Sequence, residues 1–128
     1  MLALINRDRR EAGAPALRWS AQLAAVALAH SEDMIRQGYF GHVDREGRSV
    51  SGRLSAAGIS WEAAGENIAI APTISQAETE FMDEPRNEQN HRWNILHSGY
   101  TEVGVGVARA RNGELYITQD FMKGLAGK

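Results

Sequence analysis

The sequence predicts an α+β fold, with helices over most of the chain and an antiparallel hairpin at its end. Two observations carry this prediction. Apolar residues recur at helical spacing up to about residue 96, interrupted by one short apolar strand. After residue 102 the period changes to two, on either side of an Asn112-Gly113 turn. Helices followed by a hairpin, rather than helices alternating with parallel strands, are typical of α+β domains.

Two helices are expected in the first third of the chain. Leu2 and Ile5 belong to the first, which stops at the Gly13-Ala14-Pro15 segment. Ser20 is a good N-cap for a longer second helix, and Gly38 fits the position just past its end. One face of this second helix carries apolar residues and one histidine at helical spacing: Leu23, Ala27, His30 and Met34.

A third helix and a buried strand are expected next. The helix runs from Ser49 to Ala57, with Gly58 as its stop. The segment from Ala64 to Ala71 has the composition of a short buried strand, and Pro72 ends it.

Two shorter helices complete the helical part. Ser75-Gln76-Ala77-Glu78 matches a capping box, so a fourth helix is predicted to run to about Asp83. Pro85 blocks its continuation, and a polar loop over residues 86–90 leads to a short helix from His91 to Leu96.

The hairpin has an unusual first strand. Val103, Val105 and Val107 alternate with two glycines, Gly104 and Gly106. A glycine face carries no side chains, so we expect another backbone or a bulky side chain to pack against it. The second strand alternates in the same way, through Leu115, Ile117, Gln119 and Phe121.

The composition excludes several classes of protein. The 128 residues predict one domain spanning 1–128, and 43% of them are hydrophobic, enough for an ordinary core. The net charge is -2 and no block of Lys or Arg occurs, which argues against nucleic-acid binding. No apolar run approaches the ~18 residues of a membrane span. The absence of cysteine excludes disulfides, thiolate nucleophiles and cysteine-ligated zinc.

Two of the four histidines are candidates for function. His30 lies on the apolar face of a helix and is expected to be a hydrogen-bonded core residue. His97 lies in a Ser-Gly loop and is expected to be solvated or to cap the preceding helix. His42 and His91 lie where regular elements end or begin, as do Glu66 and Glu84, and such positions often carry function. Spacing alone leaves two alternatives open: a metal or catalytic quartet, or satisfied polar residues around loops.

Five motifs follow one another along the chain. They are Phe40-Gly41-His42-x-Asp44, Gly65-Glu66-Asn67-Ile68, Phe81-Met82-Asp83-Glu84, His91-Arg92-x-Asn94-Ile95-Leu96, and Tyr100-Thr101-Glu102-Val103-Gly104-Val105-Gly106-Val107. In this order, and over nearly the whole chain, they resemble the CAP superfamily of cysteine-rich secretory, antigen 5 and pathogenesis-related proteins. The resemblance is to its short, cysteine-free bacterial members.

The resemblance implies a three-layer α-β-α sandwich with a small antiparallel sheet. It also implies a cleft that holds two histidines and two glutamates, which fall on His42, Glu66, Glu84 and His91 of this sequence. These four residues are the candidate metal site.

The chain departs from the family pattern in two places near the second glutamate. The aromatic residue three positions before Glu84 is usually Trp and is Phe81 here. The segment between Pro85 and His91 is also longer than in the shortest bacterial members, so Glu88 competes with Glu84 for the place of the second glutamate.

The quartet supports two kinds of chemistry. Two neutral imidazoles with a carboxylate or water complete a tetrahedral zinc site, so zinc is the first cofactor expected if a metal binds. His42 and His91 would be the ligands, while Glu66 and Glu84 would hold a bound water or orient the imidazoles. Without a metal, each glutamate accepts a hydrogen bond from a histidine and ties the loops together.

The expected function is that of an exported binding module, extracellular or in the cell envelope, with a leader or anchor preceding the domain. Its partner would be a small molecule, a lipid or a peptide, with apolar contacts from Tyr39, Phe40 and Trp61. No nucleic-acid partner and no transmembrane segment are expected, and we expect a monomer.

Two alternative functions remain open. One is a metal-dependent hydrolase, protease-like, in which Glu66 or Glu84 is the catalytic base. The other is a structural domain with a vestigial cleft.

Overall fold

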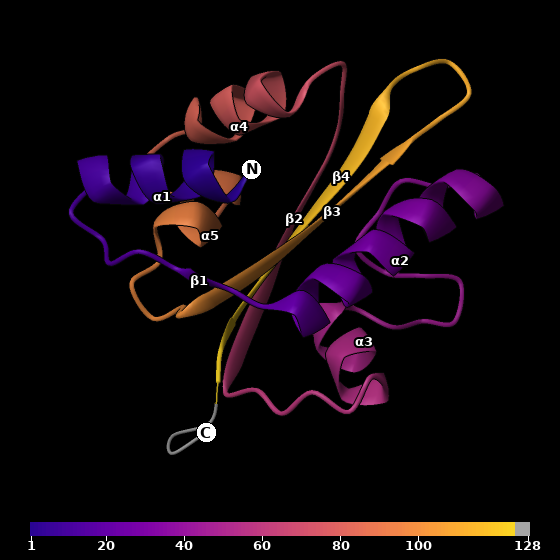
Figure 1. Ribbon diagram of the computed structural model, residues 1–128, viewed down its shortest axis with the longest axis horizontal. Helices are drawn as coiled ribbons and strands as arrows, with labels where there is room; N and C mark the ends of the chain where they lie inside the picture. Colours follow the sequence, from indigo (N-terminus) through magenta and orange to yellow (C-terminus); the bar gives the residue numbers. More distant parts are fainter. Residues whose placement is uncertain (125–128) are drawn as a thin grey trace.

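In the computed structural model, the described residues 1–124 form a four-stranded sheet with helices on both faces (Figure 1). The elements are α1 Leu2–Glu11, β1 Arg18–Trp19, α2 Ala21–Gln37, α3 Val50–Ala56, β2 Ala63–Ala71, α4 Ile74–Met82, α5 His91–Leu96, β3 Glu102–Arg109 and β4 Leu115–Lys123. The strand order is β1-β3-β4-β2, so β2 is an outer strand. The predicted α+β class is confirmed.

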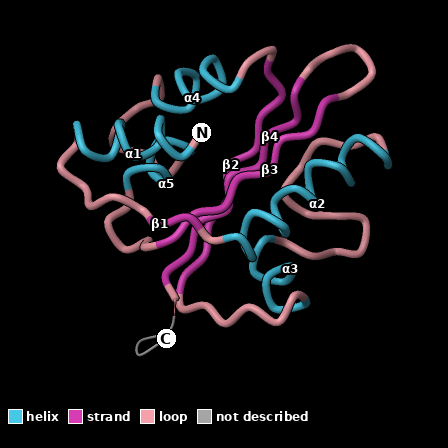
Figure 2. The backbone as a smooth tube through the Cα atoms, in the orientation of Figure 1, coloured by secondary structure: helices cyan, strands magenta, loops and turns pink. Residues whose placement is uncertain are grey.

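The layers follow from the alternation of side chains between the two faces of the sheet along each strand. Figure 2 shows α2 and α3 on one side of the sheet and α1, α4 and α5 on the other, which is the predicted α-β-α sandwich. Strands β2 and β4 are antiparallel, with Glu66 opposite Asp120 and Asn67 opposite Gln119. Because successive side chains point to opposite faces, these two cross-strand pairs belong to different layers. Within residues 1–124, no helix combines the length and the apolar character needed to cross a membrane.

Local signals set most helix ends where they were predicted. Ser20 Oγ accepts a hydrogen bond from Leu23 N at 3.1 Å and begins α2, and Gly38 ends it with a left-handed φ of 69°. Asn90 Oδ1 accepts from Trp93 N at 3.1 Å and begins α5.

Two local predictions were wrong or incomplete. Helix α4 begins at Ile74, because the Thr73 side chain accepts from Gln76 N at 3.0 Å and caps it. The predicted cap at Ser75 therefore lies inside the helix. Strand β1 was not predicted, because its two residues, which pair in parallel with β3, are too few to show a period.

The glycine face of β3 lies against α2, as predicted. A Cβ added to Gly104 would lie 2.1 Å from Ala24 N, and one added to Gly106 would lie 2.1 Å from Leu28 N. Both distances are far below van der Waals contact, so only glycine lets helix and strand approach this closely.

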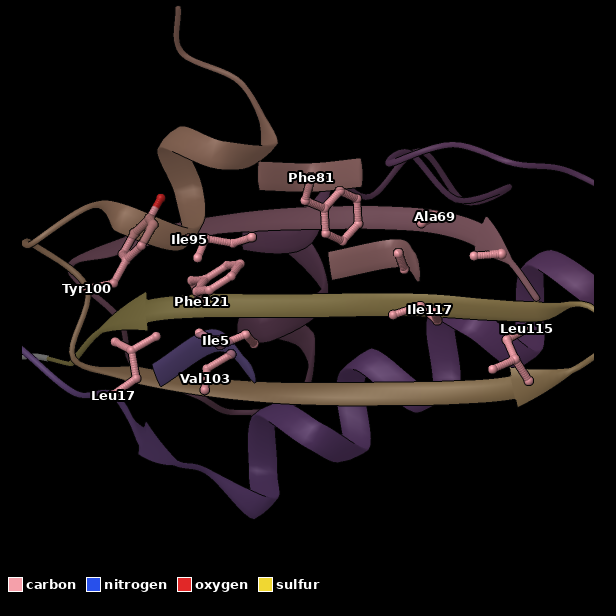
Figure 3. Packing of buried hydrophobic residues seen from close by; sticks show 12 residues of the cluster. Ile5, Leu17, Ala69, Phe81, Ile95, Tyr100, Val103, Leu115, Ile117 and Phe121 are labelled. Carbon is pink, nitrogen blue, oxygen red and sulfur yellow. The ribbon is translucent and has the colours of Figure 1, made fainter. Parts of the chain in front are cut away.

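The main core fills the space between the sheet and α1, α4 and α5. Figure 3 shows side chains from these elements on this face of the sheet, among them Phe81, Ile95 and Phe121. A smaller cluster of Leu23, Leu54, Ile59 and Met122 lies on the other face, under α2 and α3. The outer strand β2 therefore has one helical layer on each side, and the loops of both layers meet at its edge.

Candidate functional site

A pocket of about 440 Å³ lies beside β2 and contains all four candidate residues. Its lining consists of imidazoles, carboxylates and amides: His42, Glu66, Glu84, Gln89, Asn90, His91 and Asn94. The sequence places these residues on three segments, the loop after α2, the strand β2 and the segment from α4 into α5. The fold thus brings the predicted quartet to one pocket.

The first histidine is held by a buried ion pair. His42 Nδ1 lies 3.0 Å from Glu66 Oε1. Arg53, from α3, donates to Glu66 Oε2 at 2.7 Å and to Glu66 Oε1 at 2.8 Å. The Glu66 side chain is 2% exposed and that of His42 is 51% exposed, so the carboxylate is fixed inside while the imidazole reaches the solvent.

Glu66 is ionised in this setting, and its neighbour Asp120 is not. Burial opposes the charge of Glu66, but hydrogen bonds with His42, Asp120 and Arg53, together with the Arg53 charge, lower its pKa to about 2. Burial, with the hydrogen bond and charge of Glu66, raises the pKa of Asp120 well above its usual range. Neither Asp120 oxygen receives a hydrogen bond from a donor within the described residues. Asp120 is therefore neutral at neutral pH, beside the charged Glu66.

The second histidine is held by a helix terminus, an aromatic ring and a glutamate. His91 is the first residue of α5, and its Nδ1 lies 2.7 Å from Glu84 Oε2. The other oxygen of Glu84 accepts from Arg92 N at 3.1 Å. The imidazole stacks on Phe81, with ring centroids 4.8 Å apart. Glu84, rather than the exposed Glu88, thus pairs with His91 in this structure.

The Gly65-Glu66-Asn67 motif connects the two halves of the pocket. A Cβ on Gly65 would lie 2.3 Å from the Tyr100 hydroxyl and 3.0 Å from Asn94 Oδ1, so glycine lets these two side chains approach the strand. Asn94 of α5 donates to the Glu66 carbonyl at 3.2 Å and to Asn67 Oδ1 at 2.9 Å. Asn67 in turn donates to the His91 carbonyl at 3.1 Å.

A buried polar chain continues from this motif into the core. Asn67 Nδ2 donates to Gln119 Oε1 at 3.0 Å, and Gln119 Nε2 donates to Glu78 Oε1 at 3.0 Å. Burial, the hydrogen bond with Asp8 and the charge of Asp8 raise the pKa of Glu78 to about 8, although Gln119 opposes this. The core beneath α1 and α4 therefore holds a second protonated carboxyl group.

The other histidines have structural surroundings. His30 is 2% exposed and donates from Nε2 to the Gly41 carbonyl at 2.8 Å, which confirms its predicted place in the core. His97 is the residue at the end of α5 and is half-buried, because its ring stacks on Trp93 with centroids 4.2 Å apart. Of the two places expected for His97, solvated or capping the preceding helix, the structure shows the second, with His97 as the C-cap residue of α5.

Arg53 and Asp120 are site residues that were not predicted from the sequence. Arg53 lies three residues after Val50 and next to Leu54, which places it on the inward face of α3. That position was a usable signal, because an arginine on an apolar helix face needs a buried partner. Asp120 had no such signal, since its partner Glu66 follows only from the strand register.

The three residues expected to offer apolar contacts do not line this pocket. Phe40 is 51% exposed and has its ring against Tyr116, while Tyr39 and Trp61 are half-buried. Within residues 1–124, no three His, Asp or Glu side chains lie close enough together to form a metal-binding group. The pocket presents two separate His–Glu pairs.

Comparison with known proteins identifies the family of the chain. Residues 2–121 match the cysteine-rich secretory protein family, CAP. This chain belongs to the CAP family. The CAP domain is 38% identical over 123 residues to the uncharacterized membrane protein YlbC of Bacillus subtilis, covering 96% of this chain and 33% of YlbC.

Solved CAP structures share its fold. An extracellular protein of Bacillus anthracis that contains an SCP domain is 32% identical, with a TM-score of 0.79, over 93% of this chain and 37% of its own. NaASP2, solved with Zn²⁺, has a TM-score of 0.65 at 14% identity, over 94% of this chain and 75% of its own, which shows a shared fold. The CAP domain thus spans about a third of YlbC and of the Bacillus anthracis protein.

Proposed function

We propose that this CAP domain is an extracellular binding module whose pocket takes a divalent cation, zinc in the first place, together with a polar ligand. One observation carries the proposal: each pocket histidine is held at Nδ1 by a glutamate, at 3.0 Å for His42 and 2.7 Å for His91. A neutral imidazole that donates its Nδ1–H to a carboxylate has its lone pair at Nε2, the usual arrangement of a metal-binding histidine.

The donor set fits zinc better than the harder cations. Because no three such side chains form a group within residues 1–124, the protein would supply two imidazole ligands alone, His42 and His91 through Nε2. Glu66 and Glu84 would orient the two rings. Two imidazoles leave further positions of a tetrahedral ion to water or to a ligand. Magnesium and calcium prefer more oxygen ligands than this pocket supplies. The Zn²⁺ in the NaASP2 structure adds support from a protein of the same fold.

The ligand class follows from the rest of the lining. Three amide side chains, those of Gln89, Asn90 and Asn94, border the same pocket as the histidines. Amides offer both donors and acceptors, which suits a small polar molecule or a peptide. The apolar Phe40 lies outside the lining, so a lipid is less well supported.

The geometry favours binding over the hydrolase alternative. Both oxygens of Glu66 are occupied by Arg53 and His42, and its pKa of about 2 makes it a weak base at neutral pH. Both oxygens of Glu84 also accept hydrogen bonds, from His91 and from Arg92 N. A general base would have to give up one of these contacts to activate water.

Calorimetric titration of the chelator-treated protein with ZnCl₂ tests the proposal. We expect saturable binding of one ion, with binding lost in His42→Gln and in His91→Gln. His97→Gln is the matched control, because His97 does not line the pocket, and it should bind as the unsubstituted protein does. Zinc at a hundredfold excess over its Kd should add about 2.7 kcal/mol to the free energy of unfolding.

Two results would overturn the proposal. One is the absence of zinc binding to the unsubstituted protein, and the other is undiminished binding in both pocket variants. Cleavage of peptides or esters that needs zinc and is abolished by Glu84→Gln would favour the hydrolase instead.

A further inference from the structure

The two histidines of the pocket are held in place by different means. His91 is fixed by its position at the start of α5, by stacking on Phe81 and by Glu84. His42 lies in the loop between α2 and α3, outside any helix or strand, and its side chain is 51% exposed. The direction of its imidazole therefore depends on a few polar contacts.

Those contacts converge on one buried guanidinium. Arg53 donates to the His42 carbonyl at 2.7 Å and to both oxygens of Glu66 at 2.7 and 2.8 Å. Glu66 in turn holds the His42 ring at Nδ1. Arg53 thus reaches His42 twice, directly at its backbone and through Glu66 at its side chain.

The planar, five-donor geometry of arginine suits this double contact. A guanidinium can grip a carboxylate with two parallel N–H groups while one of its nitrogens also reaches a third acceptor. A lysine ammonium is a point charge on a flexible stem and cannot reproduce the paired contact. The Arg53 side chain is only 7% exposed, so water competes little for these bonds.

A second core residue supports the same loop. His30, from α2, donates to the carbonyl of Gly41, the residue before His42. The carbonyls of Gly41 and His42 are therefore hydrogen-bonded to α2 and α3. The rotation of the His42 ring is then set by the Arg53–Glu66 pair.

We propose that Arg53 is a positioning residue of the pocket, which fixes the tautomer and direction of the His42 imidazole before any ligand binds. The proposal rests on the proposed function only in treating His42 as a ligand-binding group. A merely structural ion pair would stabilise the fold without setting the state of one histidine relative to the other, and this difference makes the role measurable.

Nitrogen NMR of the imidazoles at about pH 8.5, where an ordinary histidine is neutral, tests the proposal with Arg53→Lys. In the unsubstituted protein we expect His42 and His91 both as the Nδ1–H tautomer. In Arg53→Lys we expect His42 to shift to a mixture of tautomers while His91 stays unchanged. Arg48→Lys is the matched control, since Arg48 pairs with Asp44 on the same loop and does not contact Glu66.

Zinc titration of the same proteins gives the second measurement. Loss of a group that orients a metal-binding histidine typically weakens metal affinity 10–100-fold, and we expect a loss of about this size in Arg53→Lys and none in Arg48→Lys. A folded Arg53→Lys protein with an unchanged His42 tautomer would overturn the proposal. If the unsubstituted protein binds no zinc, the proposed function fails, while the tautomers still decide the role of Arg53.

A measurement on the unsubstituted protein covers the case in which Arg53→Lys does not fold. The guanidinium protons of Arg53 should exchange with water more slowly than those of Arg48, whose side chain is 40% exposed. Equally fast exchange at both arginines would overturn the proposal.

Discussion

Replacing Gly104 by alanine tests the contact between α2 and β3, which the alternating glycines predicted. The added Cβ would lie 2.1 Å from Ala24 N and 2.4 Å from the Leu23 carbonyl carbon, whereas ordinary contacts begin near 3.4 Å. The neighbours are helix backbone, so relief requires moving α2 away from the sheet by about 1 Å. Overpacking of a core costs about 1–3 kcal/mol, and we expect the upper end because backbone cannot rotate away as a side chain can.

Urea unfolding followed by circular dichroism measures this cost. We expect Gly104→Ala to lose about 3 kcal/mol, equivalent to roughly 10 °C in melting temperature. Gly41→Ala is the control, because a Cβ there meets nothing within 4 Å and its backbone is not left-handed. It should change the free energy of unfolding by less than about 1 kcal/mol. If Gly104→Ala unfolds within 1 kcal/mol of the unsubstituted protein, as an order-of-magnitude bound, the close packing of α2 on β3 is wrong.

Substitutions at three further residues test the buried polar groups. The pKa of Glu78 is about 8 in the folded protein, against 4.5 ordinarily. Between these two pH values Glu78 holds a proton in the folded protein that the unfolded chain lacks. The stability that this proton contributes is therefore lost as the pH rises through this range. Urea unfolding at intervals of pH over this range should show the free energy of unfolding falling by up to about 1.4 kcal/mol per pH unit. Glu78→Gln should remove this fall, and an unchanged pH dependence in the variant would contradict the prediction. Asp120→Asn should cost less than about 1 kcal/mol at neutral pH, because Asp120 is already neutral. Asp120→Ala should cost about 1–3 kcal/mol, because it removes the buried polar neighbour of Glu66. Equal melting temperatures for the two variants would refute this. Arg9 is fully buried and donates to the carbonyls of Pro15, Ile95 and His97. Arg9→Met leaves these carbonyls without a donor, so it should lower the free energy of unfolding by at least about 3 kcal/mol in thermal unfolding. A smaller loss would mean that water replaces the guanidinium.

The elements of this fold were readable from the sequence because their signals are local. The Ser20 cap acts on the amide of Leu23, three residues away, and Gly38 ends α2 through its own backbone conformation. The Asn112-Gly113 turn joins β3 and β4 within a few residues. Such signals fail where two compete, as at Thr73 and Ser75, because either side chain can cap a helix, and in the structure Thr73 is the one that does.

The four pocket residues were named from the sequence through family resemblance, whereas their surroundings depend on the tertiary structure. Glu66 meets Arg53 from α3 and Asp120 from β4, and neither partner is set by residues close to it in sequence. The sequence by itself determined which residue types are present and where helices and strands form. The strand register and the packing of two helical layers decided which carboxyl groups become buried, and burial in a low dielectric decides which of them keep a proton.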